Sequence, residues 1–161
     1  MFPRLLRAAR GLAVALPLLA AACGTSDRPT APITDVADAT FASSLDVDLA
    51  ASTRLPSGVY IRDLAVGEGD AVASNSAVSA HYTLWLSSGR LMEQSPDDQP
   101  LQFTLGRREA IPGFEIGLVG MQPGGRRQII IPPLLGFGAR PYGDIPAFSI
   151  LVFEVELLEV Q

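Results

Sequence analysis

The chain has few of the side chains on which most enzymes rely. Its 161 residues include a single cysteine, Cys23, and a single histidine, His81. One cysteine cannot form an intramolecular disulfide. Metal ligands come in clusters, so His81 alone does not predict a metal site. His81 would be the only histidine base for a Ser-His-Asp set, and no serine lies in a sequence that suggests a nucleophile elbow. No glycine-rich phosphate loop joins a strand to a helix. We therefore expect no metal and no cofactor.

Positive charge is also scarce. The chain has no lysine, and its formal net charge is −5. Nucleic-acid binders need clustered basic charge to displace counterions, so this balance argues against a nucleic-acid partner. No feature of the sequence suggests self-association, and we expect a monomer.

The first 22 residues have the three parts of a signal peptide. Arg4, Arg7 and Arg10 form a positive region, and an uncharged apolar run over 12–22 follows. That run is shorter than the roughly 20 residues of a permanent membrane helix. It ends in small residues of the kind that a signal peptidase reads. Residues 1–22 therefore predict export from the cytoplasm.

Cys23 directly follows the small residues Ala20, Ala21 and Ala22. This arrangement resembles the lipobox of bacterial lipoproteins, in which the cysteine is acylated, although Ala20 stands where leucine is usual. The alternative is an ordinary signal peptide that leaves Cys23 near the mature end. We predict a lipid anchor on Cys23 and a membrane-anchored protein on the periplasmic or extracytoplasmic side. Residues 23–54 are rich in Ala, Ser, Thr, Asp and Pro, which predicts a flexible tether.

Residues 55–161 have the length of one domain. Apolar alternation and turn residues predict strands at 58–66, 77–86, 90–94, 100–106, 126–132 and 149–160. Phe114, Leu118 and Met121 recur at helical spacing, between a Pro-Gly turn at 112–113 and a Pro-Gly-Gly stop at 123–125. The predicted class is α+β, a mostly antiparallel, curved β-sheet wrapped around one short α-helix, with an apolar cleft between them.

Several motifs in this domain occur in a recognisable order. They are Ala-His-Tyr-Thr at 80–83, Phe-Thr-Leu-Gly at 103–106, Glu-Ala-Ile-Pro-Gly-Phe at 109–114, Gly-Phe-Gly at 136–138 and Leu-Val-Phe-Glu-Val-Glu-Leu at 151–157. In order and spacing the domain resembles the FKBP-type peptidyl-prolyl cis-trans isomerases, also called rotamases. The resemblance covers nearly all of residues 58–161 and implies the same fold, with a pocket that binds a prolyl ring.

The resemblance also implies the site residues. The catalytic positions would be Tyr82, Phe114, Phe137 and Phe153. The substrate-binding positions would be Met92, Glu93, Leu101, Ala110, Ile111 and Ile145. In the family, the ring at the Phe114 position is the platform for proline, and the N–H at the Ile111 position holds a carbonyl. Periodicity alone favours another reading, in which the inward aromatic rings only pack the core.

The family's reaction needs no acid, base or nucleophile, which fits the side chains that are missing here. Phe137 lacks the hydroxyl of the tyrosine usual at its position, and Met92 and Glu93 replace a Phe-Asp pair. We therefore expect weaker isomerase activity and weaker macrolide affinity than is typical. The predicted function is isomerisation of X-Pro bonds in exported proteins, with proline-containing polypeptides as substrates. Two alternatives remain: a proline-binding module or chaperone with little turnover, and a structural β-domain with no ligand.

Overall fold

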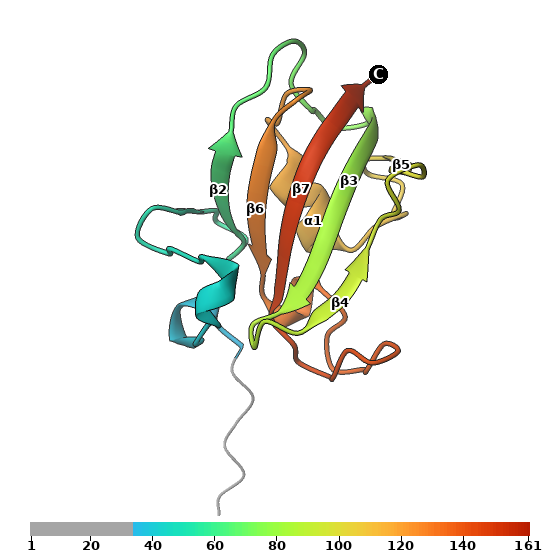
Figure 1. Ribbon diagram of the computed structural model, residues 1–161. Helices are drawn as coiled ribbons and strands as arrows, with labels where there is room; N and C mark the ends of the chain where they lie inside the picture. The colour runs from blue at the N-terminus through green and yellow to red at the C-terminus, as the bar shows by residue number, and fades with distance from the viewer. Residues whose placement is uncertain (1–33) are drawn as a thin grey trace, which may run out of the picture. The chain divides into compact units, whose positions relative to one another are not determined.

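Seven antiparallel strands and one short α-helix form the core of the computed structural model, which describes residues 34–161 (Figure 1). The elements are β1 Thr53–Arg54, β2 Tyr60–Ala65, β3 Ala77–Leu86, β4 Leu91–Gln94, β5 Leu101–Thr104, α1 Pro112–Leu118, β6 Arg126–Ile131 and β7 Leu151–Val160. The sheet order is β1-β2-β6-β7-β3-β4, and β5 also pairs with β3. The predicted α+β class, with an antiparallel sheet and a single helix, is confirmed.

The predicted signal peptide, Cys23 and the first part of the tether lie outside the described residues. Within residues 34–161, no helix is both long enough and apolar enough to cross a membrane.

The two long strands follow the predicted alternation. Strand β3 has the bounds expected for it, and Val78, Ala80 and Leu84 are buried on one face. On β7, the buried residues Leu151 and Val155 face the same core. Because β3 and β7 pair along most of their lengths, their inward side chains form one continuous apolar surface at the centre of the sheet.

Helix α1 lies against the inner face of the sheet and is held close to it by two glycines. Pro112 occupies the first turn, where its missing N–H has no helical partner in any case. A Cβ at Gly113 would clash with Ile131, and one at Gly117 would lie 2.8 Å from Ile129 Cδ1. These positions are four residues apart and share one face of the helix. The glycines therefore let α1 approach β6 more closely than any side chain would allow.

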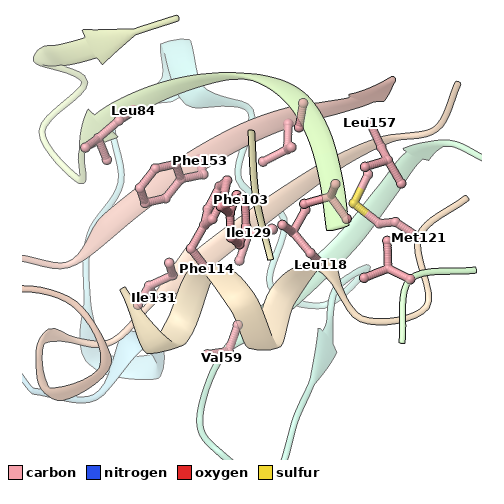
Figure 2. Packing of buried hydrophobic residues seen from close by; sticks show 14 of the residues in the cluster. Val59, Leu84, Phe103, Phe114, Leu118, Met121, Ile129, Ile131, Phe153 and Leu157 are labelled. Carbon is pink, nitrogen blue, oxygen red and sulfur yellow. The ribbon is translucent and has the colours of Figure 1, made fainter. Parts of the chain in front are cut away.

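The main core fills the space between α1 and the sheet (Figure 2). Phe114 and Leu118 are buried on α1, as predicted from their spacing. Met121 is also buried, although the helix ends three residues earlier, at Leu118. A turn from the Met121 N–H to the Leu118 carbonyl, 3.0 Å long, brings it back onto the core.

A second apolar cluster lies on the opposite face of the sheet and corrects the predicted tether. Residues 36–54, which we call the arm, pack there with Val36 and Leu45 buried against Ile130 and Val152. The arm includes two 3₁₀ turns, Val36–Asp38 and Ser43–Leu45, and ends in β1. The prediction of a flexible tether through residue 54 is therefore wrong for residues 36–54. The physical reason is that β6 and β7 are apolar on both faces, so their outer face also needs cover.

Candidate functional site

A cavity of about 200 Å³ opens between α1, the inner face of the sheet and the loop after β6. It is lined by Tyr82, Leu84, Glu93, Leu101, Glu109, Ala110, Ile111, Phe114, Phe137, Tyr142 and Phe153. Eight of the ten predicted site residues are among them. The structure therefore brings most of the predicted set together in one place.

Two predicted residues, Met92 and Ile145, are not part of the lining. Ile145 is buried in the main core, and Met92 is half-buried and packs against that core. Both residues therefore pack with the main core and do not line the cavity.

Three lining residues were not predicted as site residues. Leu84 was expected on the inward face of its strand, and Glu109 directly precedes Ala110 in the chain. Tyr142 is in the loop between β6 and β7, where no periodic signal indicates the direction of a side chain. Its aromatic character in an apolar loop is the only hint that the sequence contains.

Phe114 forms the floor of the cavity, and its ring is the centre of an aromatic cluster. The ring centroid of Phe153 lies 4.9 Å away, that of Phe103 5.9 Å away and that of Tyr82 6.0 Å away. Figure 2 shows Phe114 rising from α1 toward Phe103 and Phe153. Offset and edge-on contacts of this kind fix ring orientation. The floor is therefore rigid and apolar.

The Tyr82 hydroxyl is held in its neutral form at the cavity wall. Burial raises the pKa of the phenol above its usual value, and a hydrogen bond to Glu93 and the charge of that carboxylate raise it further. The Tyr82 phenol therefore stays neutral at ordinary pH, next to the Glu93 carboxylate.

The segment before α1 is braced by two carboxylates. Glu109 Oε2 accepts a hydrogen bond from the Thr104 N–H at 2.8 Å, and Glu115 Oε2 accepts one from the Gly106 N–H at 2.9 Å. The carbonyl of Ile111, the N-cap residue, accepts from the Phe114 N–H at 3.0 Å. Within residues 34–161, the N–H of Ile111 makes no hydrogen bond of its own. A backbone donor is therefore left free at the edge of the cavity.

Arg127 joins the C-terminal end of α1 to the sheet beneath it. This buried guanidinium donates from Nη1 to the carbonyls of Gly117 at 2.9 Å and Val119 at 3.0 Å. Its Nε lies 2.6 Å from Asp63 Oδ1. A cation at a helix C-terminus satisfies carbonyls that the helix leaves unpaired. Arg127 thus fixes the helix that carries the cavity floor.

The outer wall of the cavity is a loop with its own hydrogen bonds. The Phe137 and Tyr142 rings stack in parallel, with centroids 4.5 Å apart and an interplanar angle of 3°. Tyr142 and Ile145 exchange backbone hydrogen bonds of 3.0 and 2.9 Å, which close a tight turn. Oδ2 of Asp144, in that turn, lies 3.7 Å from Nη2 of Arg90. The loop therefore presents two stacked rings as a unit.

His81 lies outside this cavity. Its Nδ1 is 3.0 Å from Ser95 Oγ, so it is a hydrogen-bonded residue of the sheet. A larger hollow of about 460 Å³ surrounds His81, but charged residues such as Arg126, Glu154 and Glu156 line much of it. That hollow does not suit an apolar ring.

The sequence over residues 69–158 matches the family model described as FKBP-type peptidyl-prolyl cis-trans isomerase. The match covers more than half of the chain. The chain belongs to this family. Its fold, motif order and aromatic cavity all agree with that assignment, and the predicted resemblance is confirmed.

Relatives of this isomerase family match over the same domain. An FK506-binding protein of Neisseria meningitidis serogroup B is 42% identical over 105 residues, which are 64% of this chain and 96% of that protein. FK506-binding protein 4 of Chaetomium thermophilum is also 42% identical, over 104 residues, but the match covers 65% of this chain and only 22% of the relative. The chain thus spans about a fifth of that fungal protein.

Two solved isomerase-family structures share the fold. The crystal structure of FkpA from Escherichia coli has a TM-score of 0.64 and 32% identity, and the match covers 69% of this chain and 52% of FkpA. A peptidyl-prolyl cis-trans isomerase from Pseudomonas syringae pv. tomato has a TM-score of 0.64 and 30% identity, and the match covers 74% and 86% of the two chains. The predicted isomerase class is thereby confirmed for the domain.

Proposed function

We propose that this protein accelerates cis-trans isomerisation of X-Pro peptide bonds by binding the prolyl ring in the cavity above Phe114. The observation that carries the proposal is the arrangement of Phe114, Phe153 and Tyr82, whose rings lie within 6.0 Å of one another around a cavity of about 200 Å³. A saturated five-membered ring fits an aromatic floor of this kind, and a polar group would not.

The barrier to X-Pro rotation comes from amide resonance and is about 18–20 kcal/mol. At the twisted transition state the C–N bond loses its double-bond character, and the carbonyl oxygen carries less negative charge. Water solvates the planar amide, with its more polar carbonyl, better than it solvates the twisted amide. An apolar cavity lacks that preference and so favours the twisted state relative to water. Catalysis then arises from stronger binding of the transition state than of the ground state.

The lining residues have separate parts in this mechanism. Phe114 supports the prolyl ring, and Tyr82, Phe137 and Phe153 enclose it. The Ile111 N–H, which is free in this structure, donates to a substrate carbonyl and holds one side of the bond in place. Leu101, Ala110 and the aliphatic part of Glu93 keep water from the amide. Rotation of the other side then needs no acid, base or nucleophile.

Turnover of an X-Pro-Phe peptide by the full chain tests this proposal. In a protease-coupled assay, the chain should raise the exchange rate above the uncatalysed one, which has a time constant of about 10–100 s. A rate equal to the uncatalysed one at saturating protein, with measurable peptide binding, would favour the alternative of a proline-binding module or chaperone.

We further propose that the protein acts on exported polypeptides and is held at a membrane by a lipid on Cys23. The support is the sequence of residues 1–23, which lie outside the described residues. Cys23→Ser should move the protein from the membrane fraction to the soluble fraction. A Cys23→Ser protein that stays with the membrane would contradict the lipid anchor and leave the isomerase proposal unaffected.

A further inference from the structure

A prolyl peptide that enters the cavity brings backbone carbonyls with it, and these carbonyls lose their hydrogen bonds to water. A buried carbonyl without a donor is destabilising, so the cavity has to offer donors at its edge. Among the side chains that line it, only Tyr82 and Tyr142 carry a donor hydrogen. The other lining side chains are hydrocarbon or carboxylate.

Of these two phenols, that of Tyr142 is the more exposed. Tyr82 is half-buried, and it lies next to the Glu93 carboxylate in the cavity wall. Tyr142 is 61% exposed and lines the cavity, so a ligand at the mouth can reach its side chain. Tyr82 and Tyr142 both line the cavity, so the two phenols lie at the same mouth.

The position of Tyr142 is also fixed before any peptide binds. Its ring is stacked on Phe137 at 4.5 Å, and its backbone is paired with Ile145 in both directions. An exposed tyrosine that is held in this way loses little conformational freedom when it meets a ligand. In this stacked pair, Phe137 provides the apolar wall and has no hydroxyl. Tyr142 is the ring that carries a polar group.

We infer that Tyr142 is a further substrate-binding residue, whose hydroxyl donates to a backbone carbonyl next to the prolyl residue. This inference rests on the proposed function and adds a side-chain donor to it. The Ile111 N–H and the Tyr142 hydroxyl together give two donors for the two carbonyls that flank a prolyl ring. The assignment makes Tyr142 a determinant of affinity for the peptide backbone, whatever side chains surround the proline.

Tyr142→Phe in the full chain tests the assignment, because it removes the hydroxyl and keeps the stacked ring. Tyr60→Phe is the matched control, since Tyr60 is buried in the cluster on the outer face of the sheet. Both kcat/KM and the Kd for the same X-Pro-Phe peptide are measured. One hydrogen bond corresponds to about a twofold to tenfold loss in both quantities for Tyr142→Phe. Tyr60→Phe should leave both unchanged.

The outcomes separate this inference from the proposed function. Equal kcat/KM and Kd for Tyr142→Phe and wild type would overturn the role of the hydroxyl. A loss seen with Tyr142→Ala but not with Tyr142→Phe would also overturn it and leave only the ring as a wall. If the wild type binds the peptide without turning it over, the proposed function fails, and the ratio of Kd values still decides the role of Tyr142. If the wild type does not bind the peptide, both fail.

Discussion

The side-chain amide of Gln128 donates a hydrogen bond to the backbone carbonyl of Leu45, with 2.8 Å between Nε2 and the oxygen. Gln128 belongs to β6, and Leu45 belongs to the arm, 83 residues earlier in the chain. The bond is buried on the face of the sheet that is opposite to the cavity. It shows that the arm is part of the folded domain rather than a spacer before it.

Leu45→Ala tests the structural role of the arm. The side chain is 8% exposed and packs with Val36 and Ile130, so its truncation should lower the free energy of unfolding by about 2–3 kcal/mol. Urea unfolding measures this loss. Leu134→Ala, at a leucine that is 75% exposed, should change stability little and serves as the control. Equal stability of the two variants would mean that the arm is not packed in solution.

The arm also shows where sequence patterns stop being informative. Its composition is that of a disordered linker, and its few apolar residues follow no regular period. The missing evidence lies elsewhere in the chain, in three successive isoleucines at 129–131. A strand with apolar residues on both faces implies cover on both sides, but it does not identify the segment that supplies the cover.

The close approach of α1 to the sheet leads to a second prediction. Gly117→Ala places a methyl group against Ile129 and should destabilise the protein by about 1–3 kcal/mol. In an Ile129→Ala background the same substitution has space and should be less harmful. A double-mutant cycle by chemical denaturation measures the coupling between the two residues. An equal effect in both backgrounds would show that the glycine is not needed for packing.

The raised pKa of Tyr82 predicts how stability depends on pH. Because the pKa is higher in the folded than in the unfolded protein, the folded state favours the neutral phenol. That contribution is complete below the unfolded value of about 10 and is lost as the pH rises above it. Wild type should therefore lose more stability than Tyr82→Phe between pH 9 and pH 11. Parallel urea unfolding curves with the same pH dependence would contradict this.

The regular parts of the site were predictable, and the loop parts were not. Tyr82 and Phe153 lie on long strands, and Phe114 lies on the helix, so alternation and helical spacing fix their inward direction. Phe137 and Tyr142 lie in a loop, where direction depends on a ring stack and a tight turn that no periodicity encodes. Met92 and Ile145 were assigned by their positions in the family alone, and in the structure both pack with the main core and do not line the cavity. Tertiary contacts decided each of these differences.

In the proposed mechanism, the Phe114 ring supports the prolyl ring while the X-Pro bond rotates. The most direct test of this role is protease-coupled turnover of an X-Pro-Phe peptide by Phe114→Ala, with Leu118→Ala as the matched control. Both residues are buried on the same helix, but Leu118 does not line the cavity. Each truncation should destabilise the protein by about 2–5 kcal/mol, so rates are normalised to the folded fraction. Phe114→Leu, which keeps most of the volume, covers the case in which Phe114→Ala does not fold.

For the folded protein, kcat/KM should fall about tenfold or more in Phe114→Ala and should also fall in Phe114→Leu. It should stay near the wild-type value in Leu118→Ala. Equal normalised rates for the Phe114 and Leu118 variants would contradict the role of Phe114 as the platform for proline.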